Sequence, residues 1–261
     1  MREGGAAAAP VVGARLAVRD LTRLRRHPGT AVNLLFLPVF LVAVWARSFS
    51  AVARVDGFPA RTVLDWIVPL ALLSACASAA LITGFAVARD IESGFIDRLL
   101  VAPVPPLGLV AGSLIAGVCR AVLPLVVVLG VAIALGADLL GGVAGVAMAT
   151  LAALGTALCT SAWAVGLALR LGSIRRSVHV MQTGSAVALY VSTGLAPLSL
   201  MSPWLRTTAT LNPMTPVFTM ARQGFLGPVT WGQTWPGLSA LGLGAAVLCG
   251  FAVRGLRRYR P

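Results

Sequence analysis

Long apolar runs constrain the fold of this chain more than any other feature. A helix needs about 20 consecutive apolar residues to cross the hydrocarbon core of a bilayer. Charged residues make up only 11% of the chain, against roughly 25% in soluble domains. The sequence therefore predicts an all-α polytopic membrane protein with six transmembrane helices and no soluble domain. The six runs lie at about 30–46, 66–88, 109–137, 143–169, 178–201 and 236–253.

Arginine placement predicts the orientation of these spans. With six spans both termini lie on one side, and fifteen arginines are in or beside the segments on that side. Cytoplasmic loops are enriched in basic residues, so both termini are predicted to lie in the cytoplasm, with the spans in the cytoplasmic membrane. The net charge of +13 then faces anionic lipid headgroups and not nucleic acid, which would need a soluble basic face. The arginines on the opposite side are Arg47, Arg54, Arg61, Arg206 and Arg222.

The segment before the first apolar run has the pattern of an amphipathic helix. Arginines recur at helical spacing opposite an apolar stripe until Pro28 and Gly29 end the pattern. The pattern predicts that residues 1–29 form an interfacial helix on the cytoplasmic leaflet, ahead of one transmembrane domain at 30–261. The alternative is that this basic segment only flanks the first span and fixes its orientation in the membrane. The arginines of this segment are Arg15, Arg19, Arg23 and Arg26.

A charged segment at residues 89–105 separates the second and third runs and holds three of the eight acidic residues. A short helix starting near Asp90 would gather its apolar side chains on one stripe, with Asp97 and Arg98 facing elsewhere, until Pro103 ends it. Such a helix is suited to docking against another protein, and a solvated loop is the alternative. The apolar stripe consists of Phe95, Ile96, Leu99 and Leu100.

Residues 202–235 are too apolar for a free loop and too broken by proline for a spanning helix. We expect short re-entrant or surface-lying helices on the outer side. Gly141 and Gly145, at the start of the fourth run, have the spacing that allows helices to approach closely. Arg120 is the one charge well inside an apolar run. It is expected either to reach water near the cytoplasmic boundary or to face a pocket or a partner.

The chain lacks the residues that would power transport or catalysis by itself. Ion-coupled carriers keep ionisable groups near the bilayer midplane, and no acidic residue lies there. The sequence contains no lysine, so it cannot form a P-loop for ATP. No catalytic triad or metal-binding motif is visible, and the four cysteines are expected to be packing residues. We therefore expect no enzyme activity, no metal and no cofactor on this chain.

Three passages resemble the membrane permease subunits of type-2 ATP-binding cassette (ABC) exporters, especially the group similar to the daunorubicin-resistance membrane protein. The resemblance covers the chain from end to end, with Val104-Pro105-Pro106 in place of the basic residue that many relatives carry after the proline. The passages are Arg25-Arg26-His27-Pro28, residues 90–103 (Asp-Ile-Glu-Ser-Gly-Phe-Ile-Asp-Arg-Leu-Leu-Val-Ala-Pro), and Asn212-Pro213-Met214-Thr215-Pro216 followed by Arg222 and Gly227.

This resemblance implies a cytoplasmic coupling helix between spans two and three and short extracellular helices between spans five and six. It also implies a dimer of permeases, identical or related, bound to two copies of a separate ATPase that holds ATP and Mg. The implied coupling residues are Asp90, Glu92, Ser93, Gly94, Phe95, Asp97, Arg98, Leu99 and Leu100. The implied extracellular gate residues are Asn212, Pro213, Thr215, Pro216 and Arg222.

The sequence as a whole predicts a permease subunit that exports a lipophilic substrate, since a pathway lined by Ala, Val, Leu and Gly offers few fixed polar contacts. Drugs, antibiotics, lipids and lipid-linked glycans all fit this description. The alternative is a membrane scaffold or immunity protein without transport activity.

Overall fold

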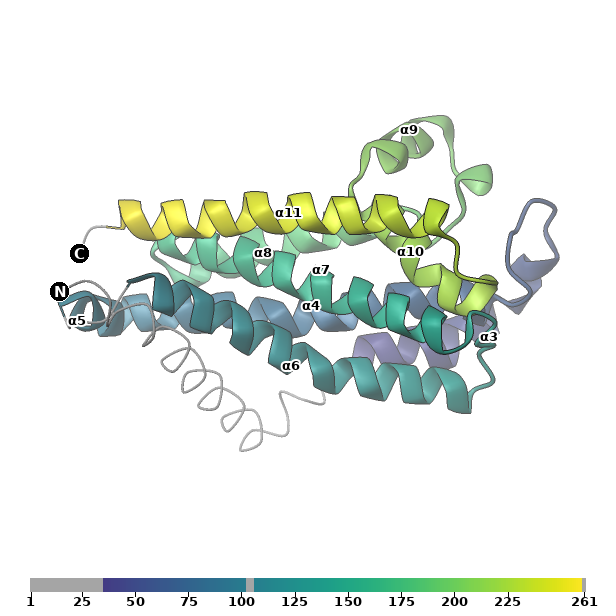
Figure 1. The fold of residues 1–261 in the computed structure, drawn as a ribbon, viewed down its shortest axis with the longest axis horizontal. Coiled ribbons are helices and arrows are strands. Elements are labelled where there is room, and N and C mark those ends of the chain that lie inside the picture. The colour runs from purple at the N-terminus through teal and green to yellow at the C-terminus, as the bar shows by residue number, and fades with distance from the viewer. Residues whose placement is uncertain (1–34, 102–105, 260–261) are drawn as a thin grey trace.

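The computed structural model describes residues 35–101 and 106–259, without the side chains of 99–101 and 106. Within these ranges every regular element is a helix. Four long helices run side by side along the length of the molecule (Figure 1), and each is long and apolar enough to cross a membrane. They are α4 (Val63–Glu92), α6 (Pro106–Ala134), α7 (Gly142–Leu171) and α11 (Trp231–Arg258).

These helices correspond to the predicted second, third, fourth and sixth spans. The predicted first and fifth spans contain shorter helices, Leu35–Ser48 and α8 (Ile174–Tyr190). The α8 helix ends at Tyr190, not near residue 201, and the chain then turns through residues 191–194. The hydroxyl of Ser192 accepts from the Gly194 N–H in this turn, at 3.2 Å. Six full spans stay a prediction.

The α4 helix forms the centre of the bundle. In its most apolar stretch 78% of the residues are buried, against 17% in the corresponding stretch of α11. Most of α4 is apolar around its whole circumference, and such a helix is stable only where other helices enclose it. The enclosing helices include α6, α7, α8 and α10 (Met214–Leu226). Movement at either end of α4 is therefore transmitted to most of the bundle.

Short elements gather at the two ends of the long helices (Figure 1). One end, called the α5 end, carries α5 (Phe95–Val101) and the C-terminal end of α11. The opposite end, called the α10 end, carries α10 and the remaining short elements. Those are η1 (Leu41–Trp45), α3 (Ala46–Ser48), η2 (Ser50–Arg54), η3 (Leu198–Leu200) and α9 (Pro203–Leu211).

The region 202–235 forms two short helices, α9 and α10, as expected from its prolines. The last helix begins at Trp231, earlier than the predicted boundary at 236, and so includes Trp231 and Trp235. The α10 helix packs closely on α7. A Cβ atom added at Gly145 would lie 2.5 Å from the Cα of Gly224, so neither position has room for a side chain. The glycine spacing at 141 and 145 thus serves the contact with α10.

Candidate functional site

The predicted coupling helix begins later than expected. The α4 helix continues through Glu92, so Asp90 and Glu92 belong to the long helix and not to the short one. Gly94 then adopts φ +67°, a left-handed conformation that costs an L-residue with a side chain roughly 1–2 kcal/mol. A Cβ atom there would meet nothing within 4 Å. Gly94 is therefore needed for its backbone conformation.

The α5 helix is anchored to the bundle by one apolar and one polar contact. Ile96 is fully buried, in a cluster that includes Val87 of α4 and Leu256 of α11. The phenol of Tyr259 donates a hydrogen bond to a carboxylate oxygen of Asp97, at 2.8 Å. Asp97 is half-buried and bonds to the end of α11, whereas the sequence pattern predicted only that it faces away from the apolar stripe.

Tyr259 keeps its proton under physiological conditions. Desolvation, the hydrogen bond to Asp97 and the negative charge of that carboxylate raise the pKa of the phenol to about 12. The unperturbed value is about 10. Tyr259 therefore acts as a hydrogen-bond donor that ties the end of α11 to α5.

Glu92 joins α4 to the start of α8. Its Oε1 atom accepts a hydrogen bond of 2.7 Å from the backbone N–H of Ile174, the first residue of α8. Ser173, the N-cap residue of α8, makes no capping hydrogen bond with its side chain. A carboxylate at a helix N-terminus satisfies an unpaired N–H and interacts favourably with the helix dipole. Glu92 therefore caps a helix that lies far along the chain.

The remaining predicted coupling residues lie around the same break. Arg98 is exposed and donates to the carbonyl oxygens of Gly94 (3.3 Å) and Ser93 (3.2 Å), which holds the turn together. Phe95 is half-buried. The side chains of Leu99 and Leu100 lie outside the described residues, as do Arg15, Arg19, Arg23 and Arg26 of the predicted interfacial helix.

At the opposite end, Asn212 connects α8 to α10. Its Nδ2 atom donates to the carbonyl oxygens of Ala188 (2.9 Å) and Val191 (2.6 Å), and its Oδ1 accepts from the N–H of Met214 at 2.9 Å. One side chain thus satisfies backbone groups at the C-terminus of α8 and at the N-terminus of α10. The predicted gate residue Asn212 is therefore a joint between two short helices.

Its neighbours shape the start of α10. Pro213 is the N-cap residue of that helix. The Thr215 hydroxyl donates to the carbonyl oxygen of Ala209 in α9, at 2.5 Å. A Cβ atom added at Gly237 of α11 would lie 2.9 Å from the carbonyl oxygen of Pro216 in α10. The two helices are therefore in close contact at this point.

Arg222 differs from expectation because it is not an exposed external charge. Its side chain is only 5% exposed. The guanidinium group donates to the Thr193 hydroxyl and to the carbonyl oxygens of Thr193 and Gly194, in the turn after α8. It also stacks on Trp66 of α4, with its central carbon 3.5 Å from the ring centroid. Such a cation–π contact stabilises a desolvated guanidinium group.

Arg120 is likewise enclosed, in the middle of α6. It is 2% exposed, and its Nη1 atom donates to the Thr83 hydroxyl of α4 at 3.0 Å. This burial does not fit the expectation of an arginine that reaches water at the membrane boundary. The other alternative, that Arg120 faces a pocket or a partner, stays a prediction.

An apolar cavity of about 310 Å³ lies between α7, α8, α10 and α11. Trp163, Leu189, Val217 and Leu241 contribute to its wall. Pro213 and Met214 also line it, so the predicted gate segment forms part of the cavity. A pocket of this size and composition suits an apolar molecule or an acyl chain.

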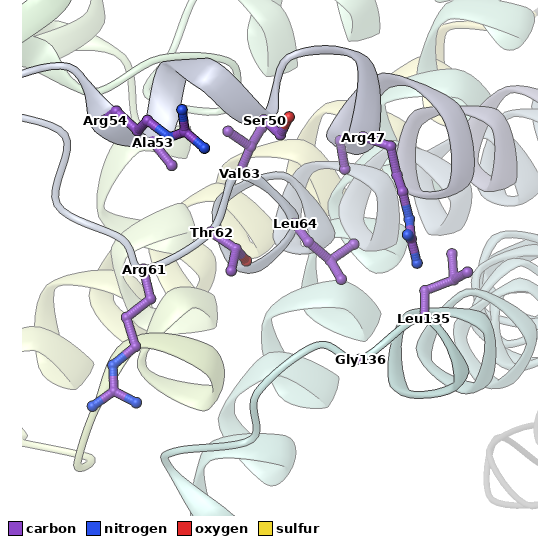
Figure 2. Close-up of a pocket in the computed structure, with 11 residues that line it drawn as sticks. Arg47, Ser50, Ala53, Arg54, Arg61, Thr62, Val63, Leu64, Leu135 and Gly136 are labelled. Carbon is purple, nitrogen blue, oxygen red and sulfur yellow. The ribbon is translucent and has the colours of Figure 1, made fainter.

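A second cavity, of about 430 Å³, lies at the α10 end beside the N-terminus of α4 (Figure 2). Its rim carries Arg47, Arg54 and Arg61, which come from three different segments. Arg47 extends toward Leu135, at the end of α6 (Figure 2). All three arginines are exposed, and the carboxylates of Asp56, Asp65 and Asp138 lie at the same end of the bundle.

In the described part of the chain, no group of three or more His, Cys, Asp or Glu side chains could hold a metal ion. The polar contacts instead join helix ends to one another. Together with the four long apolar helices, they define an integral membrane protein in which short helices at both ends are tied to the spans.

The comparisons place this membrane protein in a family. The family model described as ABC-2 type transporter matches residues 14–226, and the chain belongs to this family of membrane permease subunits. The match ends with α10, and it does not separate the daunorubicin-resistance group from the rest of the family. A search of the curated proteins found no match to the chain.

Proposed function

We propose that the chain is the membrane permease of an ATP-driven exporter in the cytoplasmic membrane, with both termini and α5 in the cytoplasm. A separate ATPase binds and hydrolyses ATP with Mg, and two ATPase copies work with two permease copies, identical or related. The observation that carries this proposal is the arrangement at the α5 end, where a short helix follows a glycine break and is tied to several spans.

The contacts of α5 give a route by which an ATPase could move the bundle. A displacement of α5 acts on α4 through the Gly94 turn and on α11 through the hydrogen bond between Asp97 and Tyr259. Movement of the end of α4 reaches α8 through Glu92. The α8 helix in turn meets the proposed gate through Asn212. Small displacements at one site are amplified when packed helices have two discrete arrangements.

The apolar cavity beside α10 supports a lipophilic substrate. A drug, an antibiotic, a lipid or a lipid-linked glycan would each fit this cavity. Pro213 and Met214 line both the cavity and the proposed gate, so opening of the α8–α10 joint would change access to the cavity.

Co-expression with the ATPase encoded nearest to this chain tests the proposal. We expect the two proteins to co-purify, and we expect ATP hydrolysis by the complex but not by this chain alone. Export of a lipophilic dye from cells should require both proteins. Robust ATP hydrolysis by the isolated chain would contradict the proposal. A stable chain that binds no ATPase and exports nothing would favour a scaffold or immunity protein instead.

A further inference from the structure

A third cavity, of about 450 Å³, lies at the α10 end between α10, the N-terminal part of α4 and the first turn of α11. None of the residues that line it is acidic. Its wall instead carries side chains that can donate hydrogen bonds. These are Trp66, Thr219, Arg222, Gln223, Thr230 and Gln233.

Two of the residues that line the cavity each carry a buried donor atom without an acceptor. The Nε1 atom of Trp66 and the Nε atom of Arg222 lack a hydrogen-bond partner, although the two side chains are only 6% and 5% exposed. They form one stacked unit, because the guanidinium carbon lies 3.5 Å from the indole centroid. Buried donors in native proteins nearly always find an acceptor, in the protein or in something bound to it.

The charge around these donors favours a negative acceptor. The terminal nitrogens of Arg222 bond only to neutral oxygens, on Thr193 and Gly194. Thr230 and Gln233 belong to the start of α11, where the positive end of the helix dipole attracts anions.

We propose that this cavity binds an oxyanion, a carboxylate or phosphate group, with Arg222 and Trp66 as its donors. The group belongs either to a small solute or to a lipid headgroup, since both present the same oxygens. Binding at this site requires neither ATP nor the contacts of α5. Arg222 also belongs to the proposed gate, but oxyanion binding can be measured without export, so failure of one proposal is distinguishable from failure of the other.

The test uses the purified full chain in detergent and follows its thermal unfolding midpoint. Inorganic phosphate and acetate are titrated against chloride at equal ionic strength. In a second arm, short-chain phosphatidylglycerol is compared with phosphatidylcholine of the same tail length. We expect at least one oxyanion to raise the midpoint above its matched reference, because a ligand that binds only the folded state stabilises it. The arm that responds identifies the source of the group.

Trp66→Phe is the informative variant because it removes one donor and keeps the ring beneath Arg222. We expect it to weaken the apparent affinity for the oxyanion about tenfold, the effect of losing a hydrogen bond to a charged group. Without oxyanion, its midpoint should fall modestly, because the smaller ring leaves unfilled volume in the core, so the variant is judged by the shift that oxyanion produces. A merely structural role would lower the midpoint equally with and without oxyanion.

Trp231→Phe is the matched control, because Trp231 is 72% exposed at the same end and does not line the cavity. Gly227→Leu is a second variant that adds bulk at the cavity wall, where a Cβ atom meets nothing within 4 Å. It should weaken oxyanion binding without touching either donor. The proposal is overturned if no oxyanion stabilises the wild type, or if Trp66→Phe and Trp231→Phe respond alike.

Discussion

The phenol of Tyr259 donates a 2.8 Å hydrogen bond to the carboxylate of Asp97, although 162 positions separate them in the chain. This contact joins α5 to the end of the last long helix. It is the polar contact that anchors α5 to the bundle, and the burial of Ile96 is the apolar one. Whatever acts on α5 therefore acts on both the second predicted span and the sixth.

The first prediction concerns the titration of Tyr259. Its folded pKa of about 12 exceeds the unfolded value of about 10. The contribution of this group to stability is therefore fully present below about pH 10 and is lost as the pH rises toward 12. The chain has two tyrosines, so the phenolate difference spectrum between the wild type and Tyr259→Phe isolates the titration of Tyr259. A midpoint near 10 in the folded protein would refute the contact.

The second prediction concerns the break at Gly94. Gly94→Val places a branched side chain at φ +67°, which costs at least about 1–2 kcal/mol, so the segment should reorient and export should fall. Gly94→Asn is the matched control, because asparagine tolerates the left-handed region far better. Dye export and ATP hydrolysis by the co-expressed complex measure the difference. Equal export by the two variants at equal expression would rule out a role for this backbone conformation.

A third prediction concerns Glu92 as the cap of α8. Glu92→Ala removes the acceptor of the Ile174 N–H, with a cost of about 1 kcal/mol, similar to the loss of an N-cap. Glu92→Gln keeps an acceptor without the charge and should retain part of that stability. Hydrogen exchange at the first turn of α8 should therefore rise most in the alanine variant. Unchanged exchange in Glu92→Ala would show that α8 is capped in another way.

The fourth prediction tests the contact between α7 and α10. Gly145→Val forces a side chain against Gly224 and should destabilise the protein by about 1–3 kcal/mol, as overpacking does. Gly130→Val makes the same change in α6, where a Cβ atom meets nothing within 4 Å, and should cost less than about 1 kcal/mol. The thermal unfolding midpoints of the two variants are measured in detergent. Similar midpoints would contradict the packing of α10 on α7.

A fifth prediction concerns topology. Thr208 on α9 and Ser93 beside α5 are both exposed and lie at opposite ends of the bundle. In a background without the four native cysteines, a cysteine at Thr208 should react with an impermeant maleimide in intact cells. A cysteine at Ser93 should react only after permeabilisation. Identical labelling of both positions would overturn the proposed orientation.

Much of the bundle could be predicted from the sequence because apolar length is a strong local signal. Four predicted spans correspond to long helices, and the prolines of residues 202–235 correctly indicated short helices. The early end of α8 at Tyr190 was missed for a physical reason. The turn is stabilised by Arg222 and Asn212, which lie later in the chain, but Ser192, Gly194 and Pro197 are local turn signals that the length of the apolar run outweighed.

The sites were predicted less well than the spans, because their contacts link distant segments. The charged segment after α4 was recognised, but its start near Asp90 was wrong, since only the φ of Gly94 separates α4 from α5. The contact of Asp97 with Tyr259 was missed because Tyr259 lies at the far end of the sequence. Four residues that make these contacts were not predicted from the sequence, because each contacts a residue from a distant segment. They are Trp66, Thr83, Thr193 and Ile174.

The burial of Arg222 also bears on how the protein is made. The oxygen atoms that Arg222 bonds belong to residues 28 and 29 positions earlier in the chain, and these leave the ribosome first. Until Arg222 follows, the carbonyl groups after α8 lack this partner, and lipid offers them none. Until α10 is made, these carbonyl groups must therefore contact water or the insertion machinery. The turn after α8 therefore acquires these hydrogen bonds only when α10 has been synthesised and has folded back onto it.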